Sequence, residues 1–354
     1  MNEQSERGGD RLKPLGVAVV GAGYWGPNLV RNFRALPEFD LSWVCDLSPE
    51  RARHAIGPRS TIRATDALED VLSDPAIDAV AVATPAGTHA EVVLACLDAG
   101  KHVLVEKPLA ASVAEGEKLV AAAEQKGLVL MCDHTYCYTP AVRKVRELTR
   151  LGELGTIQYF DSIRINLGLV QRDIDVFWDL APHDLSILDF VLPDGCVPEA
   201  VAAQGVDPIG AGHACVGYLT LRLSGGGIAH IHVNWLSPTK VRTTILGGSK
   251  RMVVWDDLNP TQRVSIYDKG VYLNGSADSE TRREALVSYR TGDMVAPALS
   301  EFEALHGALQ EFASAIREGR RPLTDGHAGL RVLKILEAVP RSGERNGAAV
   351  PVRL

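Results

Sequence analysis

Residues 16–26, GVAVVGAGYWG, decide the fold of the first part of the chain. An apolar, β-branched run ends at Gly21 and a helical pattern begins after Gly26, so this GxGxxG motif stands between a strand and a helix. In that position Gly21 permits a tight turn, Gly23 lets the backbone approach a pyrophosphate, and Gly26 lets helix and strand pack closely. The free N–H groups that begin the helix favour phosphate. We therefore predict a dinucleotide-binding loop.

An acidic residue follows this loop at the distance that ribose binding requires. Asp46 ends the apolar run at 41–46, twenty residues beyond Gly26. A carboxylate there binds the ribose hydroxyls and repels a 2′-phosphate. The next residues are Leu47, Ser48 and Pro49, with no arginine to receive a phosphate. The sequence therefore favours NAD over NADP, the alternative being a glycine turn with a chance aspartate.

Working outward from the loop, short apolar runs alternate with helical stretches. This alternation predicts βαβ units and a doubly wound parallel sheet, a Rossmann domain over residues 15–135. Gly100 and Gly127 stand where helices end in a left-handed residue. The predicted strands are 16–21, 41–46, 78–84, 101–107 and 128–133, and the predicted helices are 25–36, 49–56, 67–72, 88–99 and 113–125.

After Pro140 the pattern changes from alternation to a succession of strands. It predicts an α+β domain over residues 136–354 with an open, mainly antiparallel sheet, so the whole chain is of the α/β class. The SGGGI stretch at Ser224 is typical of a hairpin turn. The predicted helices are 141–150, 178–192, 301–318 and 327–339, and the predicted extended segments are 156–166, 200–206, 215–223, 228–235, 240–246, 252–255 and 263–267.

Composition excludes several classes of protein. The 354 residues suffice for two domains, and 44 acidic against 37 basic residues give a net charge of −7, which opposes nucleic-acid binding. No apolar run has the roughly 18 to 20 residues that span a bilayer. Residues 1–14 lack an apolar signal segment, so we expect a disordered leader and a cytoplasmic protein. Six cysteines without ligand spacing predict buried thiols and no metal site.

Four motifs in order carry a resemblance to a known family. They are the glycine loop, Thr84-Pro85 with His89, Glu106-Lys107-Pro108, and the DLAPH stretch at 179–183. Nearly the whole chain resembles the Gfo/Idh/MocA family of sugar and cyclitol oxidoreductases. The resemblance implies that Lys107, Asp179 and His183 surround the nicotinamide and the substrate carbon, and that the Lys107–Pro108 peptide is cis. The cofactor residues that we predict are Gly21, Gly23, Tyr24, Trp25, Gly26, Asp46, Thr84, Pro85, His89, Glu106 and Lys107.

Local chemistry agrees with this assignment. Lys107 ends a parallel strand, the edge at which open α/β sheets bind ligands, although a lone lysine there is usually a solvated charge. Asp179 and His183 are four residues apart, so they share a helix face. Pro182 disfavours a helix interior, and the helix could begin near Ala181 instead. A surface ion pair is the alternative for Asp179 and His183, but apolar neighbours favour a buried setting.

A lysine, an aspartate and a histidine beside NAD supply the groups needed to oxidise a secondary alcohol. We expect His183 to act as general base, Asp179 to orient it, and Lys107 to hydrogen-bond the reacting oxygen, the division of roles between Lys107 and His183 staying open. Substrate contacts are predicted for Arg164, Asn166 and Trp178, the alternative for the strand residues being a solvated face. No role is assigned to the sheet histidines His102, His213, His230 and His232, and His134 with Tyr136 and Tyr138 lies either near the cofactor or in packing.

The residues around these motifs indicate the substrate class. The stretches at 163–168, 179–184 and 253–260 resemble family members of bacterial sugar-modifying pathways. The resemblance implies a sugar, amino-sugar or nucleotide-sugar hydroxyl, often at ring position 3, in a biosynthetic pathway. The alternatives are an inositol or cyclitol dehydrogenase, an NAD-dependent glycosidase acting by oxidation and elimination, and a non-catalytic NAD-binding protein. The open sheet predicts a homodimer or homotetramer.

Overall fold

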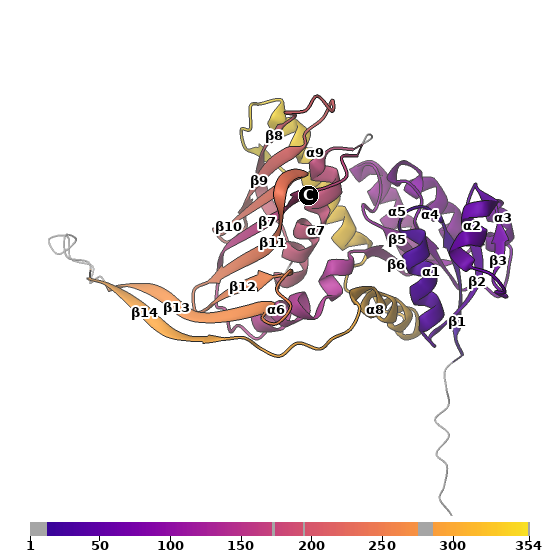
Figure 1. The fold of residues 1–354 in the computed structure, drawn as a ribbon, viewed down its shortest axis with the longest axis horizontal. Helices are drawn as coiled ribbons and strands as arrows, with labels where there is room; N and C mark the ends of the chain where they lie inside the picture. The colour runs from indigo at the N-terminus through magenta and orange to yellow at the C-terminus, as the bar shows by residue number, and fades with distance from the viewer. Residues whose placement is uncertain (1–12, 172–173, 194, 275–285, 353–354) are drawn as a thin grey trace, which may run out of the picture.

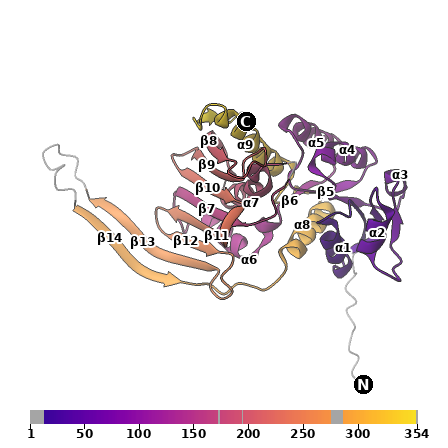
Figure 2. The same cartoon turned by 45° about the horizontal axis from the view of Figure 1, so that its top comes forward.

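The computed structural model describes residues 13–171, 174–193, 195–274 and 286–352. The predicted leader lies outside the described residues up to residue 12. Two sheets organise the chain, and Figures 1 and 2 show them side by side, with helices of the second half between them. No helix among the described residues is long and apolar enough to cross a bilayer.

The first sheet is parallel, in the order β3-β2-β1-β4-β5-β6. Its strands are almost wholly buried because helices cover both faces, which explains their continuous apolar runs. The predicted Rossmann fold is thus confirmed. β3 was not predicted, because three residues are too few to give a pattern. The strands are β1 (Leu15–Val20), β2 (Phe39–Cys45), β3 (Arg63–Thr65), β4 (Ala79–Val82), β5 (His102–Glu106) and β6 (Leu130–Asp133).

The helices of this domain begin and end at the expected signals. The Ser48 and Ser112 side chains accept hydrogen bonds from the first turns of α2 and α5. Gly100 and Gly127 take φ values of 77° and 63°, as left-handed helix ends require. The helices are α1 (Gly26–Ala35), α2 (Pro49–Ile56), α3 (Leu68–Leu72), α4 (His89–Asp98) and α5 (Val113–Lys126).

The second sheet is ordered β14-β13-β12-β11-β7-β10-β9-β8-β15. Its only parallel pair among the described strands is β7 with β10, so the predicted mainly antiparallel sheet is confirmed. Gly225 and Gly226, with φ of 94° and 87°, form the predicted turn between β9 and β10. The strands are β7 (Ile157–Leu167), β8 (Pro198–Val206), β9 (Val216–Leu223), β10 (Ile228–Asn234), β11 (Leu236–Gly248), β12 (Met252–Asp256), β13 (Val264–Asn274), β14 (Leu286–Val295) and β15 (Val350–Pro351).

β13 and β14 form an arm that extends beyond the rest of the sheet (Figures 1 and 2). The sequence prediction ended this region at Tyr267 and did not include β14. Side chains on the arm are largely exposed, Val271 to 57% and Tyr289 to 73%. Because the arm's described side chains beyond Tyr267 are exposed or only partly buried, this part of the sequence lacks the alternation of apolar and polar residues that marks a strand.

Helices cover one face of the second sheet. α7 and α9 lie between the two sheets, and α9 packs on α5, α7 and β8 (Figure 1). α7 starts at Val176 because the Asp175 carboxylate accepts a hydrogen bond from the Trp178 N–H, so a start near Ala181 is wrong and Pro182 lies inside the helix. The elements are η2 (Thr135–Tyr138), α6 (Pro140–Arg150), α7 (Val176–Val191), α8 (Ala304–Glu318) and α9 (Gly326–Gly343).

Candidate active site

The glycine loop lies at the carboxyl edge of the parallel sheet, where β1 leads into α1. Gly21 has φ of 97°, and a Cβ on it would lie 2.5 Å from the Ala83 carbonyl oxygen. A Cβ on Gly26 would collide with the Gly21 carbonyl, so both positions require glycine. A Cβ on Gly23 would meet no atom within 4 Å. The space beside Gly23 fits a pyrophosphate, as the sequence predicts.

Asp46 is buried beside this loop. Its Oδ2 accepts a hydrogen bond from the Ala22 N–H at 2.7 Å, and its Oδ1 accepts from the Ser48 N–H at 2.8 Å. The Arg51 Nε also donates to Oδ1, at 3.0 Å, and the Arg51 side chain is 59% exposed. Arg51 lies just beyond residues 47–49, which contain no arginine, so the prediction of NAD binding did not include it. The first turn of α2 returns Arg51 to the end of β2, so the ribose end carries a positive charge as well as a negative one.

His89 joins the segments that follow β4 and β5. Its Nδ1 lies 2.8 Å from the Pro108 carbonyl oxygen and its Nε2 lies 2.8 Å from the Thr84 carbonyl oxygen. Burial lowers the pKa of this imidazole, and the neutral ring donates to one of the two carbonyls. The Lys107–Pro108 peptide between these segments is cis, as the family resemblance implied. His89 therefore holds Thr84 and Lys107 in position instead of presenting a free nitrogen to the cofactor.

Lys107 and Asp179 meet across the two domains. The Lys107 Nζ donates to the Asp179 carbonyl oxygen at 3.0 Å and to its Oδ1 at 3.3 Å, and both side chains are 21% exposed. The Asp179 Oδ2 accepts a hydrogen bond from the Trp235 Nε1 at 3.0 Å. Lys107 and Trp235 thus occupy both carboxylate oxygens. The pairing that we predicted between Asp179 and His183 is not among the hydrogen bonds of the described residues, although the two share α7.

His183 lies against Tyr136, with ring centroids 4.9 Å apart and planes inclined by 65°. Its Nδ1 is buried without a hydrogen-bond partner in the described part of the chain. Burial is the main cause that holds the pKa of His183 well below its usual range, and the positive charges of Lys107 and Arg164 act in the same direction. The imidazole is therefore neutral at neutral pH and able to accept a proton.

The predicted substrate residues lie in three different settings. Arg164 is buried, with Nε 2.8 Å from the Asp184 Oδ2 and Nη2 3.0 Å from Oδ1, and its guanidinium lies 4.4 Å from the Tyr136 ring centroid. It is neither on a solvated strand face nor free of protein partners. Asn166 is half-buried near the end of β7. Trp178 is half-buried and packs against both hydrophobic cores.

Several buried polar atoms at this edge have no hydrogen-bond partner in the described part of the chain. Glu106 and Asp133 pair across β5 and β6, and burial raises the pKa of both carboxyl groups, with the Asp133 charge adding to the shift of Glu106. Glu106, Asp133 and Trp25 interact with one another, so the atoms at this edge without any partner among the described residues are both ring nitrogens of His134 and Nδ1 of His183. Because buried polar groups are almost always hydrogen-bonded, this set fits a polar ligand such as the nicotinamide end of NAD.

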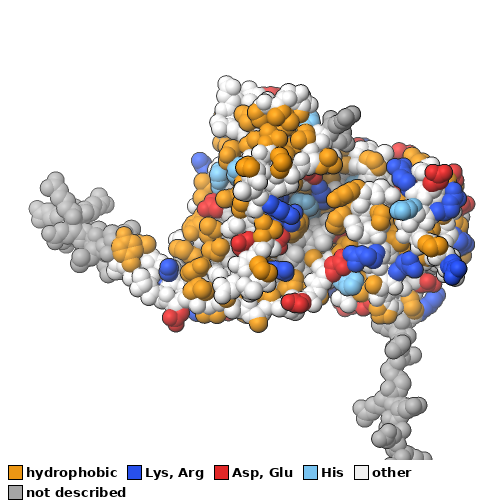
Figure 3. Space-filling model, in the orientation of Figure 1, with side chains coloured by type: hydrophobic (Ala, Val, Ile, Leu, Met, Phe, Trp, Pro, Cys, Tyr) orange, Lys and Arg blue, Asp and Glu red, His pale blue; other side chains and the backbone are white. Residues whose placement is uncertain are grey.

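Figure 3 shows the surface hollowed between the two domains, with histidine side chains visible there.

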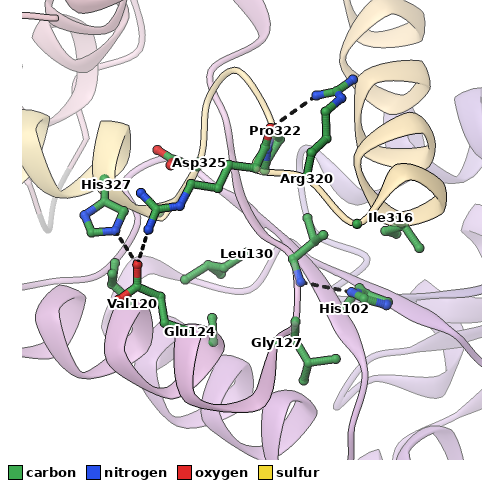
Figure 4. A pocket seen from close by; sticks show the side chains of 16 residues that line it. His102, Val120, Glu124, Gly127, Leu130, Ile316, Arg320, Pro322, Asp325 and His327 are labelled. Carbon is green, nitrogen blue, oxygen red and sulfur yellow. Dashed lines mark hydrogen bonds and ion pairs between the residues drawn. The ribbon is translucent and has the colours of Figure 1, made fainter. Parts of the chain in front are cut away.

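A separate cavity of about 420 Å³ lies at the opposite edge of the parallel sheet, where β5 and β6 begin (Figure 4). Its charged groups pair with one another: Glu124 accepts from Arg321 at 2.5 Å and contacts the His327 ring at 2.8 Å. Because parallel sheets bind nucleotides at the carboxyl ends of their strands, this cavity is not the nucleotide site.

Comparison with protein families identifies both halves of the chain. Residues 15–134 match the model described as an oxidoreductase family, NAD-binding Rossmann fold. Residues 150–353 match the C-terminal alpha/beta domain of the same oxidoreductase family.

Individual relatives act on sugars and cyclitols. The chain is 28% identical to the UDP-N-acetylglucosamine 3-dehydrogenase of Acidithiobacillus ferrooxidans, over 90% of this chain and 93% of the relative. It is 23% identical to the myo-inositol 2-dehydrogenase of Thermotoga maritima, over 93% and 96%. Among solved structures it resembles GenD2 from gentamicin A biosynthesis in complex with NAD, with a TM-score of 0.79 and 26% identity over 98% of this chain and 99% of GenD2.

Proposed function

Since the chain belongs to the Gfo/Idh/MocA oxidoreductase family, with its NAD-binding Rossmann fold and C-terminal alpha/beta domain, we propose that it oxidises a secondary hydroxyl of a sugar, amino sugar or nucleotide sugar. The reverse reaction reduces the corresponding ketone. We place the reacting hydroxyl at ring position 3, in a bacterial biosynthetic pathway. The observation that supports this most is the ion pair of Lys107 with Asp179, with His183 four residues further along α7 and unpartnered polar atoms at the carboxyl edge of the sheet.

The roles that we assign follow from the charges of these groups. Bound NAD supplies the hydride acceptor. His183, kept neutral by burial, accepts the hydroxyl proton as general base. Lys107, ion-paired with Asp179, donates a hydrogen bond to the reacting oxygen and stabilises the negative charge that develops on it. Asp179 holds the ammonium in position and is itself held by Trp235. This division gives the proton to His183 and the electrostatic role to Lys107.

Support for the substrate class comes from the relatives. A nucleotide-sugar 3-dehydrogenase and a protein of gentamicin A biosynthesis are 28% and 26% identical to the chain, each over at least 90% of its length. The inositol dehydrogenase has a lower identity. We therefore rank sugars carrying an amino, acylamino or nucleotide group above cyclitols.

A substrate panel tests this ranking. Purified protein with NAD is mixed with UDP-N-acetylglucosamine, other nucleotide sugars, aminoglycosides, simple hexoses, and myo- and scyllo-inositol, and NADH formation is followed at 340 nm. We expect a sugar of the first three groups to react fastest and to lose two hydrogen atoms by mass spectrometry. Faster oxidation of an inositol would favour the cyclitol alternative. Glycoside cleavage without net NADH would favour the glycosidase, and NAD binding without any turnover would favour a binding protein.

We also propose that the chain assembles as a homodimer or homotetramer through the face of the second sheet that carries no described helix. This face exposes Ile163, Tyr218 and Ile228 on three neighbouring strands, and the Tyr218 ring stacks on His232 with centroids 4.3 Å apart. Apolar and aromatic side chains grouped in this way are typical of subunit interfaces. Light scattering at micromolar concentration should give twice or four times the chain mass, and a monomer alone would contradict the proposal.

A further inference from the structure

His134 is a buried histidine for which the reaction described above has no use. It follows β6 directly, its N–H donates to the Cys132 carbonyl at 2.8 Å, and its carbonyl accepts from the Cys137 N–H at 2.9 Å. The side chain is only 1% exposed, yet neither Nδ1 nor Nε2 has a hydrogen-bond partner among the described residues. The backbone therefore fixes the position of an imidazole whose polar atoms are unpaired.

His89 provides the comparison within the same chain. It is equally buried, but both of its ring nitrogens lie 2.8 Å from carbonyl oxygens. Leaving a buried polar group unpaired is unfavourable, so a buried histidine without partners is disfavoured unless a ligand supplies one. His89 has a structural role that its own contacts explain, whereas His134 lacks such contacts.

The neighbours of His134 indicate where the missing partner lies. Asp133 pairs with Glu106 across β6 and β5, so His134 and Lys107 follow matched positions at the carboxyl ends of neighbouring strands, and Tyr136, two residues after His134, lies against His183. Burial first, and then Lys107, lower the pKa of His134 to about 3. The ring is neutral at neutral pH, with one nitrogen that donates and one that accepts. His134, at 1% exposure, is also more deeply buried than Lys107, whose side chain is 21% exposed.

We propose that His134 contacts the carboxamide of the nicotinamide ring when NAD is bound. The carboxamide carries a carbonyl acceptor and an NH₂ donor, so it offers a partner to either tautomer of a neutral imidazole. No other described residue offers the His134 ring a hydrogen bond. The inference rests on the proposed function, because it takes the nicotinamide to lie at the carboxyl ends of β5 and β6.

The test compares NADH with ADP-ribose, which has the same adenine and pyrophosphate but no nicotinamide. Dissociation constants are measured by calorimetry for wild-type protein, His134→Phe and His134→Gln. The control is His327→Gln, at the opposite edge of the sheet. We expect His134→Phe to weaken NADH binding about tenfold, which corresponds to about 1.4 kcal/mol, the size of one hydrogen bond. ADP-ribose binding should stay within about twofold in every variant, and His134→Gln should recover part of the NADH affinity.

Other outcomes overturn the proposal. Unchanged NADH affinity in His134→Phe would mean that the ring does not contact the carboxamide. An equal loss for NADH and ADP-ribose would mean that His134 only supports the fold. If both His134 variants fail to fold, wild-type protein is tested with pyridine adenine dinucleotide, in which a hydrogen atom replaces the whole carboxamide group. Equal affinity for NAD and this analogue would then contradict the proposal. Failure of the proposed function is recognised separately, as wild-type protein that binds NADH but oxidises no sugar.

Discussion

The buried Arg164–Asp184 pair leads to a prediction about stability that requires no substrate. The two side chains are 5% and 1% exposed and form two hydrogen bonds, of 2.8 and 3.0 Å. Asp184 also accepts a hydrogen bond from the Ser162 hydroxyl at 2.8 Å. In Arg164→Met the carboxylate stays buried with this one remaining bond. Breaking a buried ion pair by removing one partner costs about 3 to 5 kcal/mol, which is the loss of unfolding free energy that we expect.

A double variant separates the cost of the unpaired charge from the cost of lost packing. Asp184→Asn keeps an oxygen for Ser162 but removes the charge, so the Arg164→Met/Asp184→Asn protein should be at least about 1 kcal/mol more stable than Arg164→Met alone. Arg164→Lys keeps the charge but not the bidentate hydrogen bonding, so its unfolding free energy should lie between those of the wild type and Arg164→Met. Urea unfolding followed by tryptophan fluorescence measures wild type, Arg164→Met, Asp184→Asn, the double variant and Arg164→Lys. A cost below about 1 kcal/mol for Arg164→Met, or strictly additive losses in the double variant, would refute the structural role assigned to Arg164.

Three further predictions concern acid stability, cofactor choice and the imidazole base. The folded-state pKa of His134, about 3, lies below its unfolded value of about 6.5, so below pH 6.5 the unfolded chain binds a proton that the folded chain does not. As the pH falls from 7.5 to 5.0, this group should lower the unfolding free energy of the wild type by about 2 kcal/mol, and His134→Phe should lack this loss. The same pH dependence of urea unfolding in both proteins would contradict the prediction. NAD should bind more tightly than NADP. Asp46→Ala should reduce this difference in affinity, because Arg51 loses its carboxylate partner and becomes able to pair with the 2′-phosphate. Equal affinities of the wild type for NAD and NADP in a fluorescence titration would refute the assignment of Asp46. His183→Gln should lower kcat about 10²- to 10⁴-fold and leave NADH affinity within about twofold, whereas unchanged kcat would exclude His183 as the base.

Features encoded in short stretches of sequence were predicted well. The glycine loop, its strand and its helix follow from eleven consecutive residues, and the helix ends at Gly100 and Gly127 follow from single glycines. The meeting of Lys107 with Asp179 came from the family resemblance, since no local pattern relates residues 72 positions apart.

Features that depend on distant contacts were missed. Trp235, between β10 and β11, donates a hydrogen bond to Asp179 of α7, and Tyr136 of η2 touches His183, so no spacing in the sequence reveals either contact. The predicted Asp179–His183 pair was reasonable from their i,i+4 spacing, but Lys107 and Trp235 occupy the carboxylate. The contact of Arg51 with Asp46 could have been predicted from the sequence, because a helix that begins at Pro49 places Arg51 in its first turn, next to the end of β2.

Replacement of Lys107 by methionine tests the central claim most directly. The methionine side chain has nearly the same length but no charge, so it would remove the hydrogen bond that we propose between Lys107 and the reacting oxygen while leaving the cofactor loop untouched. With the best sugar of the panel, kcat/KM is measured at 340 nm for wild type and Lys107→Met, alongside the dissociation constant for NADH. We predict a loss of about 10² to 10⁴ in kcat/KM with NADH affinity within about twofold. Turnover within about threefold of wild type would contradict the assignment of this site.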